Sequence, residues 1–243
     1  MRKAVSRLSI CFATIFCIFL FAPFGAFPLG PAPASCDDAV QARQLVDKAR
    51  MTLESFAEAR EMEGFRNLMK DAEGIFVSPQ VLRGAFIFGA SGGSGVFMVR
   101  DKTKRDWAGP AFYTIGEASF GLQIGGDASE VVLLAMTQRG VMALLSSSVK
   151  LGADVGIAVG PVGAGADAAT ANLSADIISF SRSKGLYGGV SLEGAVVAVR
   201  DGLNGAYYGR NSSPSDILIA RSVKNDHAAG LRSMVTKIAG GKN

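Results

Sequence analysis

The chain has 243 residues, 49% of them apolar and 19% charged, a globular composition with room for one domain with a sizeable core or two small ones. Its formal net charge is +4, but the first 35 residues hold three of the 25 basic residues and none of the 21 acidic ones. The remainder therefore carries only +1, which excludes nucleic acid as the expected partner because such proteins need a strongly basic surface.

The first 35 residues predict a signal peptide. A basic start within residues 2–7 precedes the charge-free residues 8–27 and an exit rich in proline and alanine. Because the apolar stretch is long, an uncleaved membrane anchor is the alternative, although the prolines within and after it count against an intact spanning helix. We expect the protein to be exported to the periplasm or the cell envelope.

Cys36 is the single cysteine that remains once the leader is removed, so no internal disulfide is expected. A cysteine at the mature start also raises lipid attachment as an alternative, and Ala34 and Ser35 fit a lipoprotein signal. Pro33, however, stands where such signals prefer leucine. Cleavage after Ala34 without lipidation is the simpler interpretation.

Two helices are predicted at the start of the remaining chain. Apolar residues recur at alternating spacings of three and four from Ala39 to Phe56, and the pattern is repeated over a shorter stretch from Phe65 to Ala72. We expect residues 37–73 to cover one side or end of a sheet. A coiled-coil seam is the alternative, but three alanines in the stripe argue against a strong free-standing one.

From Gly74 the period of the apolar residues changes to two, which predicts a glycine-rich sheet or sandwich with mainly antiparallel strands. The clearest alternation runs from Val149 to Val159, and residues 129–136 form a nearly continuous apolar run, typical of a central strand. Further strands are expected around residues 96–100, 120–124, 178–180 and 190–200. Glycine and aspartate clusters predict turns at residues 91–95, 125–127, 188–189 and 201–202.

Three helical segments are expected in the second half. Residues 139–147 have room for one or two turns, and Ser213-Pro214-x-Asp216 is an N-cap followed by proline at the first helical position. Apolar spacing from Ala228 to Ile238 predicts a closing helix. The predicted fold class is α+β, with N-terminal helices, a glycine-rich mainly antiparallel sheet or sandwich, and a C-terminal helix, in one domain over residues 37–240.

One motif points to catalysis. Residues 89–93 match the G-x-S-x-G pattern around Ser91, and His227, the one histidine, follows in the chain order of hydrolases. That pattern needs a strand, a sharp turn and a helix, whereas residues 96–100 predict another strand. One histidine and one remaining cysteine do not supply the usual zinc ligands, and no complete phosphate-binding loop is found. We expect no enzymatic activity, no catalytic residues, no cofactor and no metal.

The strongest surface signal lies at residues 100–107, which we expect at a hairpin tip. Tryptophan prefers the membrane–water interface, and cations near an anionic surface favour binding. The alternative is a solvated loop with Trp107 packed on the core. The candidate membrane-binding residues are Lys102, Lys104, Arg105 and Trp107, with Arg182 and Lys184 in a second, weaker basic loop.

Several segments together resemble the SYLF domain family. They span about residues 74–226 and comprise 92–96 with 100–101, 107–113, 119–126, 150–154, 160–165, 179–189 and 206–209. The resemblance implies a non-enzymatic lipid-binding module of an exported bacterial member; eukaryotic members bind phosphoinositides, and yeast-type members also bind and bundle actin. We expect binding to anionic lipid, with a protein-interaction scaffold of the actin-binding type as the alternative and a hydrolase using Ser91 and His227 as a less favoured one.

Overall fold

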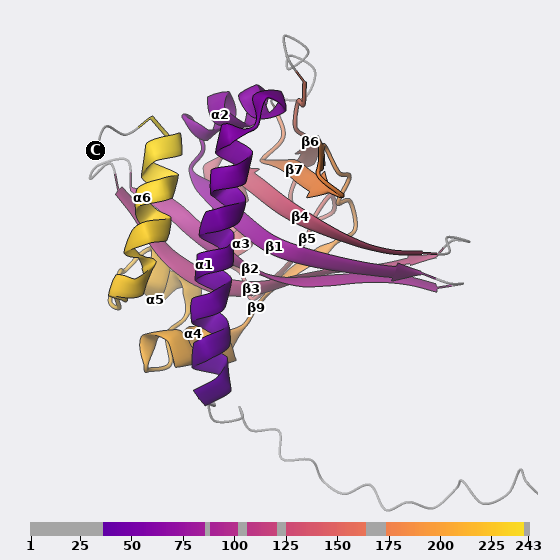
Figure 1. Ribbon diagram of the computed structural model, residues 1–243. Helices are drawn as coiled ribbons and strands as arrows, with labels where there is room; N and C mark the ends of the chain where they lie inside the picture. Colours follow the sequence, from indigo (N-terminus) through magenta and orange to yellow (C-terminus); the bar gives the residue numbers. More distant parts are fainter. Residues whose placement is uncertain (1–35, 86–87, 102–105, 121–124, 164–173, 241–243) are drawn as a thin grey trace, which may run out of the picture. The chain divides into compact units, whose positions relative to one another are not determined.

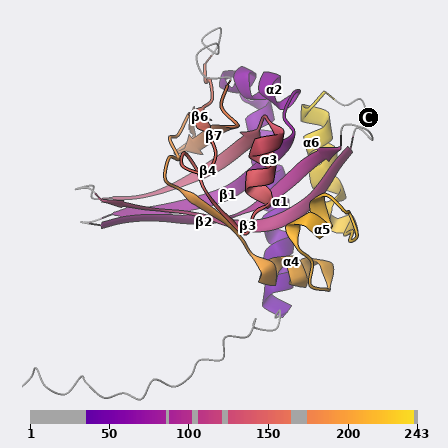
Figure 2. The same ribbon diagram turned by 180° about the vertical axis from the view of Figure 1, so that it is seen from behind.

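The computed structural model describes residues 36–85, 88–101, 106–120, 125–163 and 174–240. These residues form an α+β fold in which helices pack on both faces of one sheet (Figures 1 and 2), so the predicted fold class is confirmed. The strands are β1 (Gly74–Ala85), β2 (Phe88–Asp101), β3 (Asp106–Phe120), β4 (Gly125–Ala135), β5 (Ser148–Lys150), β6 (Ile157–Val159), β7 (Ile177–Ser183), β8 (Leu186–Gly188) and β9 (Val196–Val199). The helices are α1 (Cys36–Glu58), α2 (Glu63–Met69), α3 (Gln138–Leu145), α4 (Asp201–Tyr208), α5 (Pro214–Leu218) and α6 (Ala229–Ile238), with 3-10 turns η1 (Arg60–Met62) and η3 (Asp226–Ala228).

The sheet follows the order β5-β9-β3-β2-β1-β4-β7-β6, with β8 paired to β7 beside β6. The four long strands β3, β2, β1 and β4 pair antiparallel with one another, as expected for hairpins with short connections. Only the short pairing of β6 with β7 is parallel among the named strands. The predicted antiparallel character of the sheet is therefore confirmed.

Successive side chains of the central strands enter two different cores because they alternate between the faces of the sheet. Val132 and Leu134 of β4 pack in the cluster under α1 and α6, whereas Val131, Leu133 and Ala135 pack in the cluster under α3 and α5. This double burial explains the continuous apolar run of β4, which lies between β1 and β7 as predicted for a central strand.

The apolar stripe of α1 explains why this helix lies flat on the sheet. Its buried members, spaced by three and four residues, are fully or almost fully covered and join the core cluster of that face; they are Ala42, Val46, Ala49, Leu53 and Phe56. Figure 1 shows α1 crossing the sheet with α6 beside it. The opposite stripe of α1 is free to line a surface.

The prediction of one strand from Val149 to Val159 is wrong. The segment forms β5, a turn and then β6, since Gly152 adopts a positive φ of 82° and its N–H bonds to the carbonyl of Val155. The Asp154 carboxylate also accepts a hydrogen bond from the backbone N–H of Lys150, at 2.7 Å. A hydrogen-bonded turn over residues 150–155 therefore interrupts the alternation.

Other predictions also need correction. The expected turn at residues 125–127 lies within β4. The expected strand over residues 190–200 is confined to β9, because a turn closed between Leu192 and Ala195 precedes it. The expected turn at residues 201–202 is instead the start of α4, which the sequence analysis missed. Two buried residues of α4, Leu203 and Tyr207, hold this helix on the core despite its glycines.

The glycines of residues 91–95 lie inside β2 and do not form the predicted turn. They face a bulge in β1 at Pro79, where the pairing register shifts on both sides. A Cβ on Gly93 would lie 2.2 Å from the carbonyl oxygen of Gln80, and one on Gly95 would lie 2.4 Å from the Phe76 ring. Close packing of two strands, and not chain reversal, requires Gly93 and Gly95.

Of the helices within the described ranges, none combines the length and apolar composition that crossing a bilayer requires.

Candidate functional site

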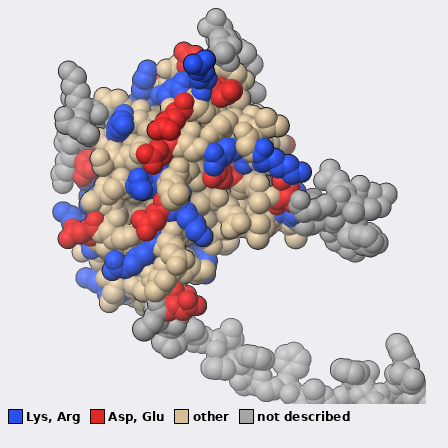
Figure 3. Space-filling view, in the orientation of Figure 1, with Lys and Arg blue, Asp and Glu red and all other residues tan. Residues whose placement is uncertain are grey.

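A long surface groove runs between one flank of α1 and the sheet; we call it the α1 groove. It consists of two hollows of about 820 Å³ and about 270 Å³, which adjoin because both are lined by Lys48, Pro79 and Gln80. Residues of α1 from Gln41 to Ser55 form one wall, and β1, β2, β4 and the β7–β8 turn contribute to the floor and the other wall. Figure 3 shows this side of the molecule, with cationic side chains interspersed among acidic ones.

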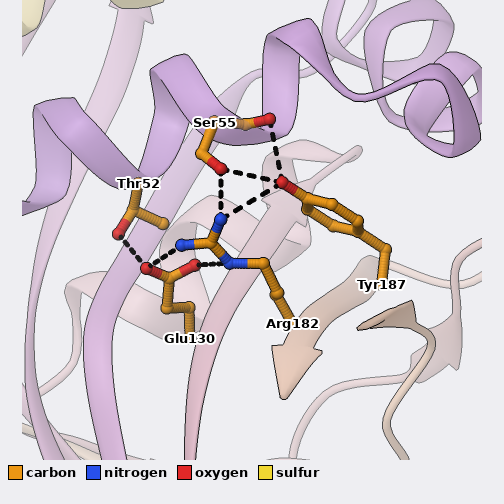
Figure 4. A network of polar contacts seen from close by, with 5 residues as sticks. All are labelled: Thr52, Ser55, Glu130, Arg182 and Tyr187. Carbon is orange, nitrogen blue, oxygen red and sulfur yellow. Dashed lines mark hydrogen bonds and ion pairs between the residues drawn. The ribbon is translucent and has the colours of Figure 1, made fainter. Parts of the chain in front are cut away.

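Four polar residues line one end of the α1 groove: Thr52, Ser55, Glu130 and Arg182. Together with Tyr187 they form what we call the Arg182 network (Figure 4). Arg182 of β7 donates from Nη2 to Oε1 of Glu130 in β4 at 2.6 Å, and its Nε lies 2.5 Å from Oε2. Thr52 of α1 donates to the same Oε1 at 3.2 Å. A bidentate ion pair between two neighbouring strands is thereby joined to the helix above them.

The other side of the Arg182 guanidinium contacts α1 and β8. Nη1 donates to Oγ of Ser55 and, at 3.3 Å, to the hydroxyl of Tyr187. That hydroxyl donates to the carbonyl oxygen of Ser55 at 3.0 Å, and the guanidinium carbon lies 5.6 Å from the centre of the Tyr187 ring. The ring also meets Phe56 edge-on, at 5.2 Å between centroids. These contacts fix the position of α1 on the sheet.

The Arg182 network leaves little free charge at this end of the groove. Its side chains are partly buried, with 29% of Arg182 and 20% of Glu130 exposed. The hydrogen bond to Glu130 raises the pKa of Arg182 further above its usual range, so the guanidinium stays charged and is neutralised by its partner. The arrangement acts as a structural clamp and a polar end wall.

The structure places the predicted basic residues in different surroundings. Lys102, Lys104 and Arg105 lie outside the described residues, although β2 and β3 pair as far as Asp101 and Asp106, which confirms a hairpin around them. Trp107 is 2% exposed and belongs to the core cluster under α1. In this structure its ring is a core residue and not a surface anchor.

Of the two predicted basic residues that the structure describes, Lys184 lines the α1 groove with an exposed side chain, whereas Arg182 is partly buried. It forms the β7–β8 turn with Gly185, and both have positive φ angles, 50° and 79°. Leu186, the next residue, is 76% exposed. Cys36, the candidate for lipidation, is the first residue of α1, and the predicted signal peptide lies outside the described residues.

The two residues of the hydrolase hypothesis do not have the surroundings that it requires. Ser91 lies within β2, opposite Arg83 and Glu117 on the neighbouring strands, so it is not at a corner between a strand and a helix. His227 faces Asp47 through Nε2 at 3.4 Å and Tyr207 through Nδ1 at 3.3 Å. Within the described ranges, no group of three or more His, Cys, Asp or Glu residues is arranged to hold a metal ion.

The sequence analysis missed most of the α1 groove. Lys48 and Met51 belong to a second stripe of α1, spaced like the buried one but rotated away from the core, and Met51 is 60% exposed. This stripe was visible as Gln41, Gln44, Lys48, Met51 and Ser55. The opposite wall could not be predicted because it comes from strands and a turn that are distant in the sequence. Gln41 and Gly185, which both line the groove, are 144 positions apart.

The match to a protein-family model lies mainly in the second half of the chain. A family model, Ysc84, described as "Las17-binding protein actin regulator", matches residues 116–238, about half of the chain. The match starts within β3 and includes the strands that carry Glu130 and Arg182.

Individual relatives extend the similarity. "LAS seventeen-binding protein 3" of Saccharomyces cerevisiae is 31% identical over 183 residues, which cover 72% of this chain and 39% of that protein. "SH3 domain-containing YSC84-like protein 1" of Homo sapiens is 29% identical over 167 residues, covering 68% and 48%. The chain thus spans less than half the length of these relatives.

Proposed function

The chain belongs to the SYLF family of Ysc84-type actin regulators, and from this membership we propose that it is a non-enzymatic protein-interaction domain of the actin-regulatory class. The description of the family names Las17 binding and actin regulation, and the yeast relative is named for binding to LAS seventeen. The binding of a protein partner, which the sequence analysis gave as the alternative, therefore becomes the first proposal.

The observation that carries this proposal is the α1 groove. Its two hollows are open to solvent along α1 and carry exposed apolar side chains, Met51 at 60% and Leu82 at 55%. Exposed apolar groups bordered by polar ones are typical of protein interaction sites. Two ionisable residues of its lining, Glu130 and Arg182, are held together in the structural ion pair.

Co-sedimentation with filamentous actin tests this function directly. The purified full-length protein is mixed with actin filaments and centrifuged, and bovine serum albumin serves as the non-binding control. We expect the protein to pellet with the filaments in a saturable manner. Protein that stays in the supernatant at filament concentrations of tens of micromolar would contradict the assignment of the actin class.

A second candidate is binding to an anionic membrane surface, and the β7–β8 turn favours it. The turn presents the cation of Lys184 beside the exposed Leu186, a combination suited to the membrane interface. The expected basic residues Lys102, Lys104 and Arg105 would add to this surface. Sedimentation with phosphatidylserine vesicles at low and high salt tests it; binding that is unaffected by Lys184→Gln and Leu186→Ser removes the turn from this candidate function.

Export also stays a proposal, supported by the basic and apolar order of residues 2–27. Mass spectrometry of the N-terminus of the protein purified from its source would show cleavage before Cys36 and any acyl group on its sulfur. An intact N-terminal leader would overturn this proposal.

A further inference from the structure

The α1 groove has dimensions that suit an extended peptide. The wall from Gln41 to Ser55 is about 21 Å long, at about 1.5 Å per helical residue. An extended chain rises about 3.3 Å per residue, so about six residues of a peptide would span it. The two hollows share three lining residues, and a single continuous ligand could therefore occupy both.

Gly92 deepens the α1 groove because it adds no side chain to the floor. This residue pairs with Leu82, which lines the groove, and directly paired residues point to the same face of a sheet. A Cβ on Gly92 would meet nothing closer than the carbonyl oxygen of Ile115, at 3.9 Å. Unlike Gly93, Gly92 is therefore not required by packing within the protein, and its missing side chain leaves room for a ligand.

The polar groups of the walls suit a peptide main chain. Gln41, Gln44 and Gln80 line the groove, and each amide side chain both donates and accepts hydrogen bonds, as a peptide unit does. Met51 and Leu82 add exposed apolar surface, and the flexible thioether of methionine adapts to different side chains.

The charge of the lining favours an acidic ligand. The lining contains one carboxylate, Glu130, and three cations, Lys48, Arg182 and Lys184. The carboxylate is paired with Arg182. Lys48 and Lys184 are exposed, one on α1 and one on the β7–β8 turn.

We propose that the α1 groove binds an extended acidic peptide segment of about six residues that carries at least one apolar side chain. The inference rests on the proposed function and deepens it, because it names the site and the chemistry of the protein partner. Carboxylates of the peptide meet Lys48 and Lys184, its main chain meets the glutamine amides, and its apolar side chain lies between Met51 and Leu82.

Peptide display against the immobilised full-length protein tests the inference with a random octapeptide library as the probe. We expect enriched peptides to contain two or more acidic residues and an apolar one. A synthetic copy of the dominant peptide is then measured by fluorescence anisotropy. Enrichment of neutral or basic peptides, or no enrichment, overturns the inference.

Matched variants locate the binding. Lys48→Gln with Lys184→Gln should weaken the peptide roughly 2- to 30-fold at low salt, with a smaller ratio at high salt, because two exposed ion pairs are lost. The control, Lys224→Gln with Lys237→Gln, removes two exposed cations that do not line the groove and should leave affinity unchanged.

Gly92→Val tests the floor, since it adds a side chain there at a position whose Cβ would meet nothing closer than 3.9 Å. We expect peptide binding to be lost with an unchanged thermal midpoint. If Gly92→Val binds the peptide as tightly as the unchanged protein, the inference is overturned. It is also overturned if no acidic peptide is enriched and the groove variants lose binding to phosphatidylserine vesicles instead. Actin sedimentation that is retained in all groove variants would leave the proposed function standing while this site fails.

Discussion

Replacing Arg182 by alanine removes a side chain that joins α1, β4 and β8. The variant leaves the Glu130 carboxylate without its cation and deletes the hydrogen bonds to Ser55 and Tyr187. Breaking a buried ion pair costs about 3–5 kcal/mol, whereas exposed pairs are worth about 0–1 kcal/mol. Because Glu130 is 20% exposed and Arg182 29%, we expect a loss between these limits, about 2–3 kcal/mol.

Chemical denaturation measures this loss, and thermal unfolding should show a midpoint lower by about 4–12 °C for a domain of this size. A double-mutant cycle with Glu130→Ala should give a coupling free energy of about 1–2 kcal/mol, because each variant removes the same ion pair. The matched control is Arg139→Ala, whose side chain is 72% exposed and lies 3.7 Å from Asp176; it should cost less than about 0.5 kcal/mol. If Arg182→Ala costs no more than this control, or if the two changes are additive, the network does not clamp α1.

Three further changes test the packing and the electrostatics. Tyr113→Phe should leave the free energy of unfolding unchanged or raise it by up to about 2 kcal/mol in denaturation experiments, because the buried hydroxyl has no hydrogen-bond partner among the described residues; a clear loss would reveal one. Gly95→Ala should lower it by about 1–3 kcal/mol, since its Cβ would lie 2.4 Å from the Phe76 ring, and an unchanged midpoint would contradict the close packing. Hydrogen bonds from Ser213 lower the pKa of Asp216 below 3.8, so its stabilisation is present above that value and is lost as the pH falls through the folded-state pKa. Asp216→Asn should therefore lower the thermal midpoint at pH 7 but not at about pH 2, and an equal effect at both would exclude this linkage.

Local sequence patterns predicted those elements whose pattern of apolar or capping residues lies within the element itself. The three-and-four spacing of α1 corresponds to its buried stripe. The predicted N-cap of α5 is confirmed, and in the structure Ser213 and Asp216 bond reciprocally as a capping box. The continuous apolar run of β4 indicated a strand covered on both faces. In each case the pattern of residues that are close in the sequence is sufficient to predict the element.

The glycines of residues 91–95 were wrongly predicted to form a turn, because the groups that require Gly93 and Gly95 lie on another strand. Gly93 and Gly95 read as turn formers, yet the bulge at Pro79 and the Phe76 ring require them in the middle of β2. The helix α4 was missed for a similar reason, since Asn204 holds it to the backbone of Phe112, 92 positions away. No local window contains such a contact.

The candidate site was predicted only in part for the same physical reason. Charge alone drew attention to Arg182 and Lys184, but it could not show that Arg182 is neutralised by Glu130, 52 positions earlier, while Lys184 remains exposed. Trp107 was weighed as a surface residue or a core residue, and its burial follows from the alternation of β3, which turns this ring towards α6 and the core.

Hydrogen–deuterium exchange of the full-length protein, with and without filamentous actin, tests most directly whether the α1 groove is a protein-binding surface. We predict slower exchange on filament binding in α1 between Gln41 and Ser55 and in the bulge around Pro79, with little change in α3 and α5 on the opposite face. Exchange that is unchanged along α1 while another surface becomes protected would contradict the account.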